Sequence, residues 1–143
     1  MIPNVDPAKA IRCLVVIICI LLLALFTLSL ANSKDAGQWE QSDPAIRSWY
    51  QGLMQPDNPT IPCCGSADAY FADKVAVRGD KVFAIITDDR PDEPLKRPHI
   101  PVGTEFEIPA NKLKWSSGNP TGHNVLFVGV TGVIYCFVQG TGI

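Results

Sequence analysis

The pattern of apolar and polar positions divides the chain into a uniformly apolar N-terminal run and a longer part made of short alternating segments. Residues 13–30 (CLVVIICILLLALFTLSL) contain only two polar side chains, Thr27 and Ser29. A helix that is apolar on every face belongs in lipid or in a large protein core. At about 1.5 Å per residue the run reaches roughly 27 Å, close to the ~30 Å hydrocarbon core of a bilayer. The run therefore predicts a transmembrane anchor or a signal peptide.

The charges around this run predict its orientation. Lys9 and Arg12 precede it, and basic residues favour the cytoplasmic side of a membrane. We therefore expect a cytoplasmic N-terminus (residues 1–12), an anchor or signal peptide (13–31), a polar tether (32–42) and an exported domain (43–143). Small residues at Ser29 and Ala31 suit cleavage by a signal peptidase, whereas a run longer than the usual ~7–15 residues favours a retained anchor. Retention predicts a single-pass inner-membrane protein with a periplasmic domain, and cleavage predicts a soluble periplasmic or secreted one.

A short amphipathic helix is predicted at the start of the exported part. Asp43 is a favourable N-cap and Pro44 a favourable first helical residue. The residues that follow place apolar side chains at i, i+3, i+4 and i+7: Ile46, Trp49, Tyr50 and Leu53. The pattern predicts a helix of about three turns that ends before Pro56 and covers one side of a sheet.

Alternating segments further along predict β-structure. Residues 74–78 and 81–87 flank the two-residue turn Gly79-Asp80, which is typical of a hairpin. The second of these strands is apolar on both faces, so we expect it to be central in its sheet and to lie under the helix. Residues 104–108 predict a third strand, and residues 112–115 a short one.

A second hairpin is predicted near the C-terminus, where residues 125–130 and 133–138 flank Thr131-Gly132. In this register Phe127 lies opposite Cys136 and the sulfur faces the core. Residues 88–103 contain prolines at four positions (91, 94, 98 and 101), which predict an irregular surface loop. The expected fold class is α+β, mostly β, with a small sheet or barrel of about five antiparallel strands.

Composition adds two constraints. Of twelve Lys and Arg residues only two precede the apolar run, and of fourteen Asp and Glu residues only one does, so the exported part is mildly acidic. It has no basic stripe for nucleic acid. About 112 residues follow the run, which is enough for one small domain with a single core.

The cysteines predict a disulfide in the exported domain. Cys13 and Cys19 lie in the apolar run, whereas Cys63, Cys64 and Cys136 lie in the part that would face an oxidising compartment. Cys136 bonded to either Cys63 or Cys64 would close a loop of roughly 70 residues, worth about 4 kcal/mol in the chain-entropy model. A vicinal bridge between Cys63 and Cys64 is the alternative.

Several motifs together resemble a family of small uncharacterised exported bacterial proteins. They are Cys63-Cys64-Gly65-x-Ala67-Asp68, the stretch from Asp88 to Pro94 (DDRPDEP), Trp115, the stretch from Asn119 to His123 (NPTGH), and Tyr135-Cys136. The resemblance covers about residues 45–138. It implies a single exported domain and assigns no catalytic residue.

Three kinds of chemistry are open to the exported part. A cysteine nucleophile would combine Cys63 or Cys64 with His99 or His123 as base and Asp68 as orienting group. A transition-metal site would draw on both histidines, Asp68 and a cysteine. A calcium site would use hard oxygen ligands from one loop: Asp88, Asp89, Asp92 and Glu93.

None of these patterns has the spacing of a known motif. The chain lacks a CxxC pair, a CxxCH haem site, a glycine-rich phosphate loop and a GxSxG turn. We therefore expect a protein that is not an enzyme and uses no cofactor. The expected role is that of a membrane-anchored accessory subunit whose partners are lipid and a larger membrane complex. The alternative is a soluble exported domain that binds a metal ion or a small ligand.

Overall fold

The computed structural model describes residues 14–18, 42–116 and 118–140. The chain separates into two units, Met1–Asn32 and Ser33–Ile143. In the first unit residues 14–18 are helical and their side chains are exposed. Within these ranges no helix has the length and apolar character needed to cross a bilayer. The predictions for residues 1–12, for the rest of the apolar run and for residues 32–41 fall outside the described residues.

The predicted helix is present as α2 (Pro44–Gly52), and its N-terminus is capped as expected. One carboxylate oxygen of Asp43 accepts hydrogen bonds from the backbone N–H groups of Ala45, at 2.7 Å, and Ile46, at 3.4 Å. These bonds satisfy two of the donors that every helix N-terminus leaves open. Leu53 follows the helix and is buried.

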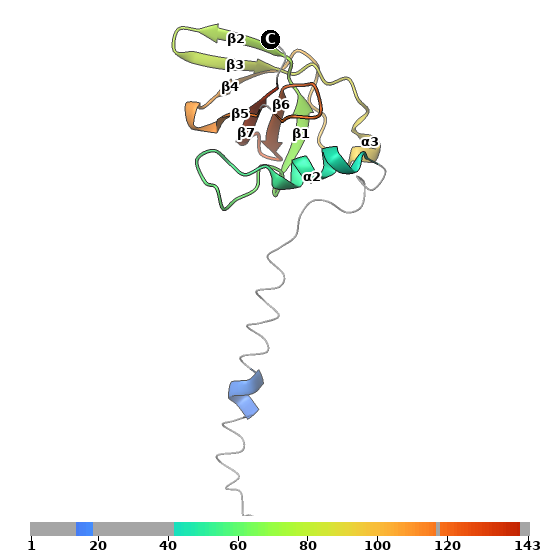
Figure 1. The fold of residues 1–143 in the computed structure, drawn as a ribbon, viewed down its shortest axis with the longest axis vertical. Helices are drawn as coiled ribbons and strands as arrows, with labels where there is room; N and C mark the ends of the chain where they lie inside the picture. Colours follow the sequence, from blue (N-terminus) through green and yellow to red (C-terminus); the bar gives the residue numbers. More distant parts are fainter. Residues whose placement is uncertain (1–13, 19–41, 117, 141–143) are drawn as a thin grey trace, which may run out of the picture. The chain divides into compact units, whose positions relative to one another are not determined.

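Within the described ranges, seven strands form two sheets, whose arrangement is shown in Figure 1. The four-stranded sheet has the order β1-β6-β7-β5 and consists of β1 (Ala67–Phe71), β6 (Val125–Gly129), β7 (Ile134–Gln139) and β5 (Leu113–Trp115). The three-stranded sheet has the order β2-β3-β4 and consists of β2 (Lys74–Arg78), β3 (Lys81–Ile85) and β4 (Glu105–Ile108). Two short helical turns, α3 (Asp92–Leu95) and η1 (Ala110–Lys112), lie in the connections.

The four-stranded sheet is the middle of three layers. On β6, Leu126 and Val128 belong to a core shared with β3 and β4, whereas Val125 and Phe127 belong to a second core with Leu53 and the cysteines. Because successive side chains of a strand point to opposite faces, the first core fills the space between the sheets and the second lies under α2. Figure 1 accordingly shows α2 and β2 on opposite sides of the domain.

The predicted fold class, α+β and mostly β, is confirmed, and so are both hairpins. β3 is the central strand of its sheet, and Phe127 lies opposite Cys136. Gly79 adopts φ +64° in the first hairpin turn, a conformation that a side chain disfavours.

Three details of the predicted fold are wrong. The described residues form seven strands where about five were expected, and β1 is a strand that was not predicted. β5 pairs parallel with β7, whereas all strands were expected to be antiparallel. The helix packs on the four-stranded sheet and not on β3, because Trp49, Tyr50 and Leu53 contact the core that contains Val125 and Phe127. The 88–103 segment is irregular as predicted, apart from the single turn of α3.

Candidate functional site

A buried ion pair anchors the 88–103 loop. Asp88 and Arg97 approach to 2.6 Å, and their side chains are 0% and 3% exposed. Arg97 also donates through Nε to Asp92 at 2.9 Å. A second guanidinium, that of Arg90, binds both carboxylate oxygens of Asp88 at 2.6–2.8 Å. Charges this deep in a domain are tolerated only when they are matched and hydrogen-bonded.

The same two side chains close the outer edge of β1. Asp88 accepts a hydrogen bond from the backbone N–H of Phe71 at 3.0 Å, and Arg97 donates to the carbonyl of Ala69 at 3.0 Å. β1 is a terminal strand of its sheet, so these backbone groups have no neighbouring strand to bind. A carboxylate and a guanidinium therefore supply the hydrogen bonds that another strand would otherwise provide.

Further bonds hold the rest of the loop against β1. Arg97 donates to the carbonyl of Arg90 at 3.0 Å, and the hydroxyl of Tyr70 donates to the carbonyl of Pro98 at 2.6 Å. The Arg97 guanidinium lies 4.6 Å from the centre of the Tyr70 ring. Within the described part of the chain every buried side-chain nitrogen and oxygen has a hydrogen-bond partner. The loop is thus fixed in one conformation although it lacks regular secondary structure.

The ring of Phe71, at the end of β1, is stacked between the side chains of Arg90 and His123. The Arg90 guanidinium lies 3.6 Å from the centre of its ring, and the His123 imidazole lies 4.0 Å away with an interplanar angle of 16°. Two groups this close to one ring centre cannot share a face, so they occupy opposite faces. The stack joins the 88–103 loop to the turn that contains His123.

A carboxylate orients the imidazole of this stack. Asp73 lies 2.7 Å from Nδ1 of His123 and accepts from the backbone N–H of Asn124 at 2.8 Å. The turn itself is organised by Asn119, whose side chain donates to the carbonyl of His123 at 2.8 Å and accepts from the N–H of Thr121 at 2.9 Å. The Asp–His pair resembles the orienting half of a catalytic triad. No contact in the described residues supplies a nucleophile to it.

The charge network determines the titration of its members. Burial acts to raise the pKa of Asp88, but the hydrogen bonds from Arg90 and Arg97 outweigh burial and hold this pKa well below its usual range. The hydrogen bond from His99 is the largest effect on Asp92 and lowers its pKa. Burial raises the pKa of Tyr70 to about 12. The carboxylates of Asp88 and Asp92 are therefore ionised throughout the neutral range, whereas the Tyr70 hydroxyl keeps its proton there.

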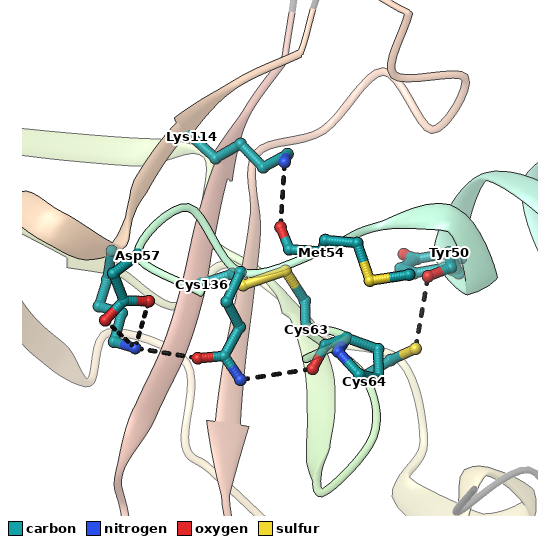
Figure 2. The surroundings of a disulfide bond; sticks show 10 residues. Tyr50, Met54, Asp57, Cys63, Cys64, Lys114 and Cys136 are labelled. Carbon is teal, nitrogen blue, oxygen red and sulfur yellow. Dashed lines mark hydrogen bonds and ion pairs between the residues drawn. A yellow bond between two sulfur atoms is a disulfide. The ribbon is translucent and has the colours of Figure 1, made fainter. Parts of the chain in front are cut away.

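The disulfide belongs to the second core, on the opposite face of β6 and β7 from the core between the sheets. Figure 2 shows its surroundings. Cys63 and Cys136 are joined, both are fully buried, and the bond links the loop after α2 to β7. The predicted disulfide is therefore present, with Cys63 as the partner of Cys136, and the vicinal alternative is wrong. Figure 2 shows the Cys64 side chain directed away from the bond, toward the carbonyl oxygen of Tyr50 at 3.3 Å.

Two lysines near β5 hold the loop that delivers Cys63. Lys114 donates to the carbonyl of Met54 at 3.0 Å (Figure 2). Lys112 binds Asp57 at 2.7 Å. A single bridge between Met54 and Pro62 closes the loop ends. These contacts hold the ends of the loop that precedes the two adjacent cysteines.

The structure does not bring the predicted metal ligands together. His99 pairs with Asp92 at 2.6 Å, His123 pairs with Asp73, and Asp68 lies on β1 opposite Val128. Asp88, proposed for calcium, is occupied by two arginines. Among the described residues no group of three or more His, Cys, Asp or Glu side chains is arranged to hold a metal ion.

The predicted nucleophile arrangement is not assembled either. Cys63 is oxidised, and the Cys64 thiol is directed at a backbone carbonyl. The two candidate bases, His99 and His123, bind Asp92 and Asp73. The contacts of the described residues therefore support no cysteine-based reaction.

No protein-family model, curated protein or solved structure matches this chain. The resemblance to small exported bacterial proteins accordingly stays a prediction. The motifs that carry it do converge: the 88–94 and 119–123 stretches meet at Phe71 through Arg90 and His123.

Sequence reasoning missed the residues that build this site, which are Phe71, Asp73, Arg90 and Arg97. The signal present in the sequence was the spacing of opposite charges in residues 88–97, DDRPDEPLKR. An acidic residue followed two residues later by an arginine allows a local bidentate pair, which Asp88 and Arg90 form. The reach of Arg97 back to β1 has no local signature.

Proposed function

We propose that this protein is a membrane-anchored, exported accessory subunit without catalytic activity, which docks on a larger membrane complex through the 88–103 loop. The observation that carries the proposal is the buried Asp88–Arg97 pair, which fixes an otherwise irregular loop in one conformation. Long ordered loops in small domains are most often binding or active-site elements. Because the charged groups of this loop are bound to one another and to β1, we assign the loop to binding and not to catalysis.

The exposed part of the loop suits a docking surface. Its prolines restrict the backbone, so little conformational entropy is lost when a partner binds. His99 and Val102 project from it, with side chains that are largely exposed. An exposed valine and an exposed histidine on one loop are the mixture of apolar and polar groups found in non-obligate protein interfaces. The apolar run at residues 13–30 would hold this surface at the membrane.

Gentle detergent extraction followed by size-exclusion chromatography tests the proposal. We expect the full chain to elute with larger membrane proteins. Val102→Glu should shift it to the size of a single detergent-bound chain, because the substitution buries a charge in the interface. Asp80→Lys, in the turn between β2 and β3, is the matched control and should leave elution unchanged. A wild-type chain that elutes alone from native membranes would contradict the proposed function.

A further inference from the structure

β2 is an open sheet edge with exposed apolar side chains. It is a terminal strand of the three-stranded sheet, and Val75 and Val77 are 39% and 69% exposed. Both valines share a face with Val82 and Ala84, their partners on β3, which belong to or border the inter-sheet core. The apolar face of the core thus continues outward onto β2, where no described segment covers it.

The hydrogen-bonding direction of β2 follows from that of β3. The N–H of Ile86 donates to the carbonyl of Thr104 next to β4, at 2.9 Å, so the even-numbered residues of β3 bond toward β4. The backbone groups of the odd-numbered residues of β3 must then bond to β2, and their partners there are the even-numbered residues of β2. The backbone groups of Val75 and Val77 consequently point outward. Across the described ranges, no backbone hydrogen bond joins β2 to any strand or loop other than β3.

The two terminal strands β1 and β2 differ in the hydrogen bonding of their outer edges. The outward backbone groups at Ala69 and Phe71 of β1 are occupied by Arg97 and Asp88. In the part of the chain that the structure describes, nothing comparable occupies the outer edge of β2. An open edge of this kind is where an extended segment from another chain adds a strand.

Charge decides what kind of segment fits. β2 carries Lys74 and Arg78 at its two ends and no acidic residue. The strand that this sheet accepts at its other edge, β4, alternates acidic and apolar residues, and its Glu105 binds Arg78 while its Glu107 binds Lys81. Opposite charges across neighbouring strands stabilise a sheet, and like charges destabilise it.

We propose that the outer edge of β2 binds an extended segment of a partner protein, in which an acidic residue lies opposite Lys74 and β-branched residues lie opposite Val75 and Val77. The segment would bond to the outward backbone groups of the two valines and extend the apolar face of the sheet. This surface is separate from the 88–103 loop, so the proposal does not depend on the function proposed above.

The charges disfavour a second copy of this chain as the occupant. Antiparallel pairing of two β2 strands about Ala76 would satisfy the backbone but would place Lys74 opposite Arg78 of the second copy, and basic residues on an edge discourage such pairing. A second copy could also present β4, but Glu105 and Glu107 already bind Arg78 and Lys81 of their own chain.

Two synthetic peptides provide the test, one with the core Glu-Val-Thr-Val-Glu and one with Lys-Val-Thr-Val-Lys. Each is titrated into the full chain in mild detergent while amide hydrogen exchange is followed by NMR. The acidic peptide should slow exchange at Val75 and Val77, and the basic peptide should not. Lys74→Glu should weaken binding of the acidic peptide about five-fold, because attraction is replaced by repulsion. Lys96→Glu, the same charge reversal in the 88–103 loop, should leave it unchanged.

Val77→Pro tests the backbone contribution. It removes an outward N–H that β3 does not use, so the hairpin should persist in circular dichroism while peptide binding is lost. If this variant does not fold, the peptide comparison and Lys74→Glu still decide. The proposal is overturned if neither peptide protects the two amides. It is also overturned if protection appears without peptide and grows with protein concentration, which would identify a second copy as the occupant.

Discussion

Removal of the Arg97 side chain would leave the buried Asp88 carboxylate with one of its two guanidinium partners. Arg97→Met should therefore lower the free energy of unfolding by about 3 kcal/mol, because a charge is left partly unmatched in the interior and the carbonyl of Ala69 loses its donor. Urea unfolding followed by circular dichroism measures the change. Arg78→Met removes an exposed pair of similar geometry and should barely move the urea midpoint. Equal effects of the two variants would contradict the importance of burial.

Acid should weaken the fold through Asp88. Its pKa is lower in the folded state than in the unfolded state, so it contributes stability above its unfolded pKa of about 3.9 and loses this contribution as the pH falls further toward the folded pKa. The free energy of unfolding should therefore decrease below about pH 4. Asp88→Asn should be less stable at neutral pH and should show a shallower decrease. Asp89→Asn, at the exposed neighbouring position, should keep the wild-type slope; an unchanged slope in Asp88→Asn would contradict this account.

At the scale of elements, the N-terminal cap of α2 can be tested alone. Asp43→Ala removes both side-chain bonds to the first turn and should cost about 1 kcal/mol of stability, with faster amide exchange in α2. Asp43→Asn keeps an acceptor oxygen and should remain close to the wild type. Faster exchange in both variants would show that the carboxylate charge, and not the capping bond, holds the helix end.

The elements that could be predicted are those with a local signature. The cap at Asp43, the turn glycine Gly79 and the alternating strands each identify themselves over a few residues. β1 could not be predicted in this way: its residues, Ala67–Phe71, include an aspartate and two alanines, which have weak strand propensity. Its strand conformation is imposed by pairing with β6 on one edge and by Asp88 and Arg97 on the other.

The same distinction applies to the candidate site. The importance of residues 88–94 and 119–123 could be suspected from their charges and turn residues, but their meeting at Phe71 depends on the arrangement of whole strands. The transition-metal hypothesis needed His99 and His123 to lie together, and the nucleophile hypothesis needed one of them near a cysteine. The fold instead pairs them with Asp92 and Asp73.

For the whole molecule, the disulfide should make a large contribution to stability. It closes a loop between residues 73 positions apart, which restricts the unfolded chain by about 4 kcal/mol. The double variant Cys63→Ser, Cys136→Ser should therefore unfold at much lower urea concentration than the wild type. Cys64→Ser should stay near the wild-type midpoint, since a hydroxyl can also donate to the carbonyl of Tyr50. A large loss in Cys64→Ser alone would contradict the assigned pairing.

The proposed function requires an exported, oxidised domain that is held at a membrane. Cells can be broken in the presence of an alkylating reagent, the membranes washed with carbonate, and the protein in each fraction analysed by mass spectrometry without reduction. We predict that the chain stays in the washed membranes, with Cys63 joined to Cys136 and Cys64 alkylated. A chain recovered from the soluble cytosolic fraction with Cys63, Cys64 and Cys136 all alkylated would contradict both the proposed location and the proposed function.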